Sequence, residues 1–97
     1  QANLIALHER DPRDEAVRRY VEVARLLTGS ERAGAAEGIA WIGHLCAHLQ
    51  IQPLRRHGIA AGDFSALIGK AANASSMKAN PIQLTSQEMH EILERAF

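Results

Sequence analysis

The side chains with the clearest potential for chemistry are two histidines, His44 and His48, four positions apart in one apolar-periodic segment. Residues four apart lie on the same face of a helix, so both imidazoles could bind one metal ion. A full metal site needs a third ligand, and no glutamate follows His44 as it does in helical zinc-protease motifs. Because both histidines fall between the apolar positions, we interpret them as exposed polar residues.

A second basic cluster precedes a predicted turn at Gly58. It consists of Arg55, Arg56 and His57, and such a cluster can attract a phosphate or a carboxylate. The alternative, which we favour, is a solvated surface. Two further histidines are isolated in the sequence, His8 and His90.

The single cysteine, Cys46, could act as a nucleophile only if a base lay beside it in space. It falls in an apolar stripe, so we interpret it as a small core residue. One cysteine cannot form an internal disulfide. We therefore expect a reducing compartment, the cytoplasm.

The segment Ser75, Ser76, Met77 and Lys78 places two hydroxyls near an amine. A serine three residues before a lysine occurs in some acyl-transfer enzymes, where the serine begins a helix. Here we expect a loop in which the hydroxyls cap backbone amides. The glycines are dispersed and none follows a predicted strand, so no phosphate-binding loop is indicated. Local motifs alone do not describe a complete active site.

Length, net charge and apolar content exclude several further classes of protein. A chain of 97 residues predicts one domain. It has 11 basic and 11 acidic residues and a formal net charge of zero, which argues against nucleic-acid binding and against a polybasic membrane anchor. Its apolar content of 46% is typical of a folded chain. We expect no membrane span, since no apolar run approaches the roughly 20 residues required, and no signal peptide.

Hydrophobic periodicity and capping residues predict an all-α fold, a small bundle of four to five helices. The predicted helices cover residues 3–10, 14–27, 35–49, 61–73 and 86–96. Gly29 should end the second helix in the left-handed conformation, and Thr85 with Glu88 should form a capping box before the last. We expect an extended connector over residues 50–54 and an ordered loop over residues 74–84.

The third predicted helix carries the most apolar pattern. We expect it to bury one stripe of side chains: Ile39, Ile42, Leu45, Cys46 and Leu49.

Several segments, taken in order, resemble the C-terminal end of the iron-containing (group III) alcohol dehydrogenases. They are residues 24–29 (ARLLTG), 38–42 (GIAWI), 51–54 (IQPL), 57–59 (HGI), 74–82 (ASSMKANPI) and 88–93 (EMHEIL). The resemblance extends over nearly the whole chain, and the order and spacing of the segments make it specific. The chain departs from the family pattern at Gln50 and Ala79, where these enzymes often have glycine.

This resemblance implies an NAD(P)-dependent oxidoreductase that interconverts alcohols and aldehydes by hydride transfer. Such enzymes have an N-terminal dinucleotide-binding domain and a helical domain, whose Asp and three His ligands bind Fe(II) or another divalent metal. By the resemblance, those ligands precede the matched region, and none of the five histidines here falls on a ligand position. The resemblance assigns no catalytic, cofactor-binding or metal-binding residue to this chain. It places only Ser75, Ser76, Met77 and Lys78 near the substrate cleft.

We therefore expect residues 1–97 to be the C-terminal helical part of a dehydrogenase, inactive alone. The dinucleotide-binding domain and the metal-ligand helices would then belong to a missing N-terminal part, its main partner. Small alcohols or aldehydes would be the parent's substrates. An alternative is a stand-alone helical module that binds a partner protein through its apolar helix faces. We expect no nucleic-acid or membrane partner, while exposed apolar surface could support a homo-oligomer.

Overall fold

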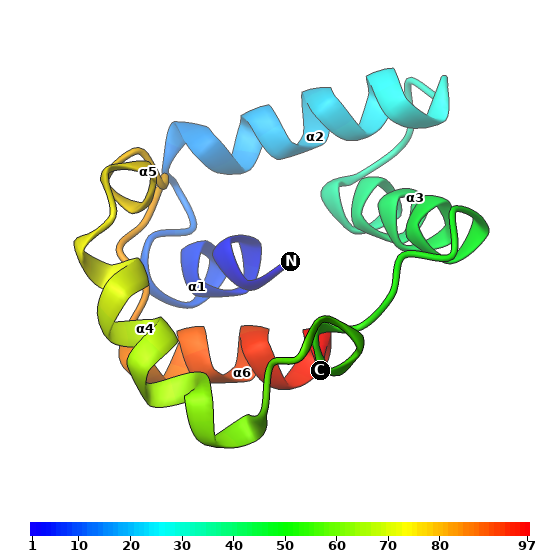
Figure 1. Ribbon diagram of the computed structural model, residues 1–97. Coiled ribbons are helices and arrows are strands. Elements are labelled where there is room, and N and C mark those ends of the chain that lie inside the picture. The colour runs from blue at the N-terminus through cyan, green and yellow to red at the C-terminus, as the bar shows by residue number, and fades with distance from the viewer. The chain divides into compact units, whose positions relative to one another are not determined.

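The computed structural model describes residues 1–97 and contains helices but no strand (Figure 1). The chain divides into two compact units. The first unit comprises Gln1 and residues 3–51, and the second comprises Ala2 and residues 52–97. The predicted all-α fold is confirmed. No helix combines the length and the apolar character that crossing a membrane requires.

Three helices lie in the first unit: α1 (Ala2–Arg10), apart from its first residue, α2 (Glu15–Thr28) and α3 (Ala35–His48). Local chemistry fixes their ends. The Asp14 carboxylate accepts a hydrogen bond from the Ala16 amide at 2.7 Å, so Asp14 is the residue that caps α2. Gly29 ends α2 with a φ of 68°, as predicted from the sequence.

Helices α2 and α3 cross at a point where the methyl group of Ala24 faces a glycine, Gly38. Ala24 of α2 is 1% exposed, and Gly38 is the buried residue of α3. A Cβ atom added at Gly38 would lie 2.6 Å from the Cβ of Ala24 and 2.8 Å from its Cα. Glycine is therefore required at position 38 by the close approach of the two backbones.

The predicted burial of the α3 stripe is wrong for most of its members. Ile42, Leu45 and Leu49 are exposed, Leu49 to 60%, and only Ile39 and Cys46 are half-buried. Periodicity shows that a helix has an apolar face, but it does not show which element covers that face. In this structure the side of α3 that meets α2 is built around Gly38.

The second unit contains two short 3-10 helices and three α-helices: η1 (Leu54–His57), η2 (Ala61–Asp63), α4 (Phe64–Asn73), α5 (Ser75–Lys78) and α6 (Ser86–Ala96). Three predictions need correction here. The predicted helix over residues 61–73 begins with a 3-10 turn. The predicted loop over residues 74–84 contains α5, whose turn is closed by the Met77 amide donating to the Ala74 carbonyl at 3.0 Å. This extra turn raises the number of α-helices to six.

The predicted connector over residues 50–54 is extended only in part. Gln50 has a φ of 52°, and the 3-10 helix η1 begins at Leu54. The left-handed region suits glycine, the residue that the resemblance leads one to expect at this position. Ala79, the other departure, has an ordinary right-handed conformation.

At two helix N-termini in this unit, the backbone amide of the capping residue donates to an acidic side chain three residues later in the chain. The Ala60 amide donates to Asp63 at 2.8 Å, and the Thr85 amide donates to Glu88 at 2.6 Å. The Glu88 amide in turn donates to the Thr85 hydroxyl at 3.2 Å, which confirms the predicted capping box.

An aromatic cluster organises the second unit, in which α4 packs against α6. The Phe64 ring is 4% exposed and lies edge-to-face against His90 and Phe97, with both centroids 5.5 Å away. Such contacts add to the free energy gained by burying the ring. Leu84 and Met89 are also buried.

Candidate functional site

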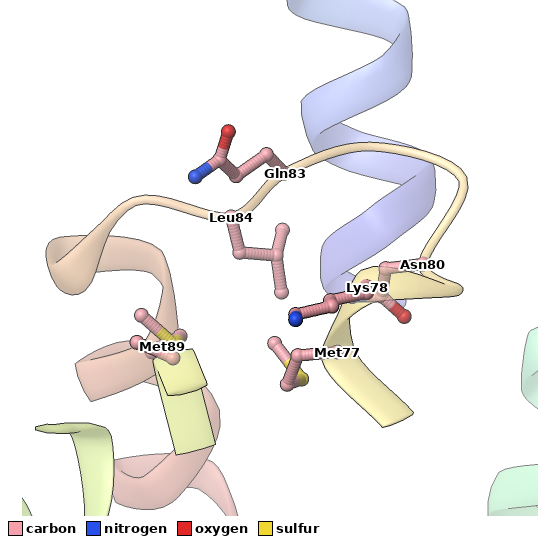
Figure 2. Close-up of a pocket in the computed structure, with 7 residues that line it drawn as sticks. Met77, Lys78, Asn80, Gln83, Leu84 and Met89 are labelled. Atoms are coloured by element: carbon pink, nitrogen blue, oxygen red, sulfur yellow. The ribbon is translucent and has the colours of Figure 1, made fainter. Parts of the chain in front are cut away.

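The pocket drawn in Figure 2 lies in the second unit and has a volume of about 330 Å³. We call it the polar pocket, because three of its residues carry polar side chains. Its lining consists of Ala72, Met77, Lys78, Asn80, Gln83, Leu84 and Met89. Helices α4, α5 and α6 and the segment between α5 and α6 all contribute to it.

Local structure determines how these side chains are presented. The single turn of α5 carries Met77 and Lys78, and the following chain returns with Leu84 opposite them (Figure 2). The Lys78 side chain extends between Leu84 and Met77, whereas the Gln83 amide points away from the other labelled side chains. Met89 approaches from α6.

The electrostatics of the polar pocket are simple. Lys78 is the only charged residue in its lining, and no acidic side chain faces it there. The Lys78 ammonium has no ion-pair partner in the chain. The pocket therefore has an uncompensated positive charge at an apolar wall.

A second pocket of about 360 Å³ lies in the same unit, and we call it the apolar pocket. Every residue that lines it is apolar: Leu54, Ile59, Leu67, Ile68, Ala71, Met77, Met89, Ile92 and Leu93. Met77 and Met89 line both pockets. The two pockets therefore share two flexible thioether side chains.

The four residues placed near a substrate cleft by the family resemblance divide into two pairs. Met77 and Lys78 line the polar pocket, whereas Ser75 and Ser76 are exposed and line neither pocket. Their place in a substrate cleft stays a prediction. The sequence places Leu84 at the end of the predicted loop and Met89 on the buried face of the last helix, but it does not indicate a pocket between them.

The structure confirms the interpretation of His44 and His48 as exposed polar residues. His44 and His48 are both exposed on α3, and no group of three or more His, Cys, Asp or Glu side chains lies close enough to bind a metal ion. His8 lines a groove of the first unit, whose lining comes from α1, α2 and the start of α3. His90 packs on Phe64, with its Nδ1 atom 3.7 Å from a Glu94 oxygen.

The basic cluster of Arg55, Arg56 and His57 is exposed, as predicted for a solvated surface. Arg55 donates a hydrogen bond to the main-chain oxygen of Phe97 at 2.9 Å, while Arg56 and His57 are exposed. Cys46 is half-buried, so its predicted place in the core is only partly correct. No sequence pattern had indicated the Arg55 bond, because it joins residues far apart in the chain.

Two side chains with shifted pKa values, Glu15 and Arg18, belong to an exposed cluster on α2. Arg18 bonds to both Glu15 and Glu22 along one helix face. The hydrogen bond and the charge of Arg18 lower the pKa of Glu15, and the same contacts raise the pKa of Arg18. These residues line neither the polar nor the apolar pocket, so the cluster stabilises α2 rather than forming a site.

Comparison with protein families gives one result. The family model described as the C-terminal part of the Fe-containing alcohol dehydrogenase family matches residues 2–97. No curated protein and no solved structure gives a significant match. The matched range includes all the segments that carry the resemblance in the sequence.

Proposed function

Because this chain belongs to the Fe-containing alcohol dehydrogenase family, we propose that it is the C-terminal helical part of an NAD(P)-dependent alcohol dehydrogenase. The parent enzyme would interconvert small alcohols and aldehydes by hydride transfer in the cytoplasm. The observation that carries this proposal is the family match, which covers the chain from its second residue to its last.

The metal centre of such an enzyme would lie outside this chain. When bound, Fe(II) or another divalent ion would polarise the substrate oxygen. The side chains present here do not fit that role, because no three potential ligands come together. We therefore assign the Asp and His ligands, together with the dinucleotide-binding domain, to an N-terminal part of the parent.

The contribution of this chain's own residues would be structural. Four large apolar side chains of α3 are exposed: Trp41, Ile42, Leu45 and Leu49. Leaving such a group in water is costly, so a contiguous apolar face usually indicates an interface. In the parent, the metal-bearing helices would cover this face, and Ser75, Ser76, Met77 and Lys78 would approach the substrate cleft.

The same face of α3 also favours the second hypothesis, a helical module that binds another protein. In that case the partner would cover the apolar side chains, and the chain would have no dehydrogenase role. The two hypotheses differ in what the gene encodes upstream of Gln1.

Sequencing the DNA upstream of the Gln1 codon tests the proposal directly. We expect a glycine-rich dinucleotide-binding segment followed by one Asp and three His at helical spacings. The complete chain should then reduce NAD or NADP with an alcohol and contain bound metal, whereas residues 1–97 alone should do neither. A start codon just before Gln1 would overturn the proposal, as would tight NADH binding by the 97-residue chain.

A further inference from the structure

The two pockets of the second unit form a pair with complementary chemistry. One compartment has a charged residue, Lys78, and the other has only apolar walls. Both are bounded by the same two side chains, Met77 and Met89. Neighbouring polar and apolar compartments match a molecule with a charged head and an apolar tail.

The dimensions fit a small amphiphile. Volumes of about 330 Å³ and 360 Å³ lie within the usual range of small-molecule sites. An apolar cavity of about 150 Å³ can bind one benzene molecule, so the apolar pocket offers space for a tail of about ten carbons. Methionine side chains can change rotamer to admit such a tail at low cost.

The charge of the polar pocket determines the head group. The Lys78 ammonium extends between Leu84 and Met77, and no carboxylate of the chain neutralises it (Figure 2). An anionic head would gain a charge-assisted hydrogen bond there, while a cationic head would be repelled. A carboxylate is the smallest common head group of this kind.

We propose that the second unit binds an unbranched alkyl carboxylate of about eight to ten carbons. Its head group contacts Lys78 in the polar pocket, and its tail passes between Met77 and Met89 into the apolar pocket. Met77 and Lys78 also belong to the segment that the proposed function places near the substrate cleft, but the binding proposal is argued from the two pockets alone and does not require the dehydrogenase assignment. Its failure would leave the proposed function unchanged.

The chain contains its own reporters for this test. Its only two methionines are Met77 and Met89, and its only tryptophan is Trp41, on the exposed α3 face of the first unit. Methyl resonances of ¹³C-labelled methionine therefore report binding at the pockets alone. Trp41 fluorescence reports non-specific association with the apolar face of α3.

The experiment is a titration of the labelled 97-residue chain with hexanoate, octanoate and decanoate below their micellar concentrations. We expect both methionine resonances to shift saturably, with Trp41 fluorescence unchanged. Affinity should rise about fourfold for each added methylene, the increase that corresponds to burying one CH₂ group. Unmoved methionine resonances, or a change confined to Trp41, would overturn the proposal.

The head group is tested with the chain's two lysines. Lys78→Gln should weaken decanoate binding about two- to fivefold, the range for an exposed ion pair, and leave decanol binding unchanged. Lys70→Gln removes the same charge from a residue that lines neither pocket, so it should have no effect. Equal effects of the two variants would overturn the assignment of the head group.

The tail is tested with Ala71→Leu, which adds a side chain to the apolar pocket. We expect the chain-length dependence to disappear in this variant. Helical circular dichroism and two resolved methionine resonances show whether the variant folds. If Ala71→Leu does not fold, Lys78→Gln still decides the proposal, because Lys78 is exposed and its replacement leaves the packing intact.

Discussion

The two units of this chain place their apolar side chains differently. In the second unit, short elements bury Phe64, Leu84 and Met89 although α5 and the two 3-10 helices offer little regular structure. In the first unit, α2 and α3 have 14 residues each, yet much of the apolar surface of α3 is exposed. Helix length and apolar content therefore do not determine burial. What decides it is whether another element lies against the apolar face.

The largest expected effect comes from comparing two leucines, one in each unit. Leu84 is 8% exposed and Leu49 is 60% exposed. Leu84→Ala should lower the free energy of unfolding by about 2–5 kcal/mol, because it leaves a cavity. Leu49→Ala should change it by no more than about 0.5 kcal/mol.

Urea unfolding followed by circular dichroism measures both variants. Similar losses in the two would contradict the comparison. They would show that the α3 face is covered in solution, for example by a second copy of the chain.

The next largest effect on the free energy of unfolding is expected at the α2–α3 crossing. It is measured by comparing substitutions at two glycines of α3. Gly38→Ala should cost about 1–3 kcal/mol, because the new methyl would overlap Ala24. Gly43 has no atom within 4 Å of an added Cβ, so Gly43→Ala should stabilise α3 by about 0.5–1 kcal/mol.

Unfolding followed by Trp41 fluorescence reports on this unit. A Gly38→Ala variant as stable as Gly43→Ala would show that the two helices separate without cost.

A smaller effect is expected at the start of α6. Thr85→Ala removes the hydroxyl that accepts from the Glu88 amide, and should cost about 1 kcal/mol. Ser86→Ala, one position later, is the control, since the Thr85 hydroxyl is the acceptor in the cap. Thermal unfolding of both variants measures the difference, and an equal loss in the two would exclude the capping role.

The smallest effect is the pH dependence of the Glu15–Arg18 pair. The pKa of Glu15 is lowered from its ordinary value of 4.5 by the Arg18 hydrogen bond and charge. The stabilisation is therefore complete above pH 4.5, and it is lost as the pH falls through the lowered value.

Glu15→Gln should reduce the free energy of unfolding slightly at neutral pH and should also reduce the loss of stability at acid pH. Glu31→Gln makes the same charge change in a loop and should leave the loss of stability at acid pH unchanged. High salt should weaken the Glu15 effect, because the pair is exposed to solvent. If wild type and Glu15→Gln lose the same amount of stability at acid pH, the pair is excluded as the cause of that loss.

Features determined by neighbouring residues could be predicted from the sequence. The end of α2 at Gly29 and the Thr85–Glu88 box each depend on a few adjacent positions, and both are found in the structure. The family resemblance was also carried by local segments, and the family match confirms it.

Features determined by distant residues could not be predicted in this way. The exposure of Leu45 and the edge-to-face contact of Phe64 with His90 depend on which helices meet. The polar pocket could not be predicted for the same reason, because its residues Met77 and Met89 come from different helices. The one-turn helix α5 was missed because four residues are too few for a periodic pattern.

The contact between Ala24 and Gly38 also constrains how this sequence can diverge. Glycine has no smaller replacement, so position 38 cannot compensate for a larger residue at position 24. Ala24 itself can be exchanged only for glycine while the helices keep their separation. Positions 24 and 38 are therefore constrained together during divergence. A larger residue at either position requires a larger separation between α2 and α3.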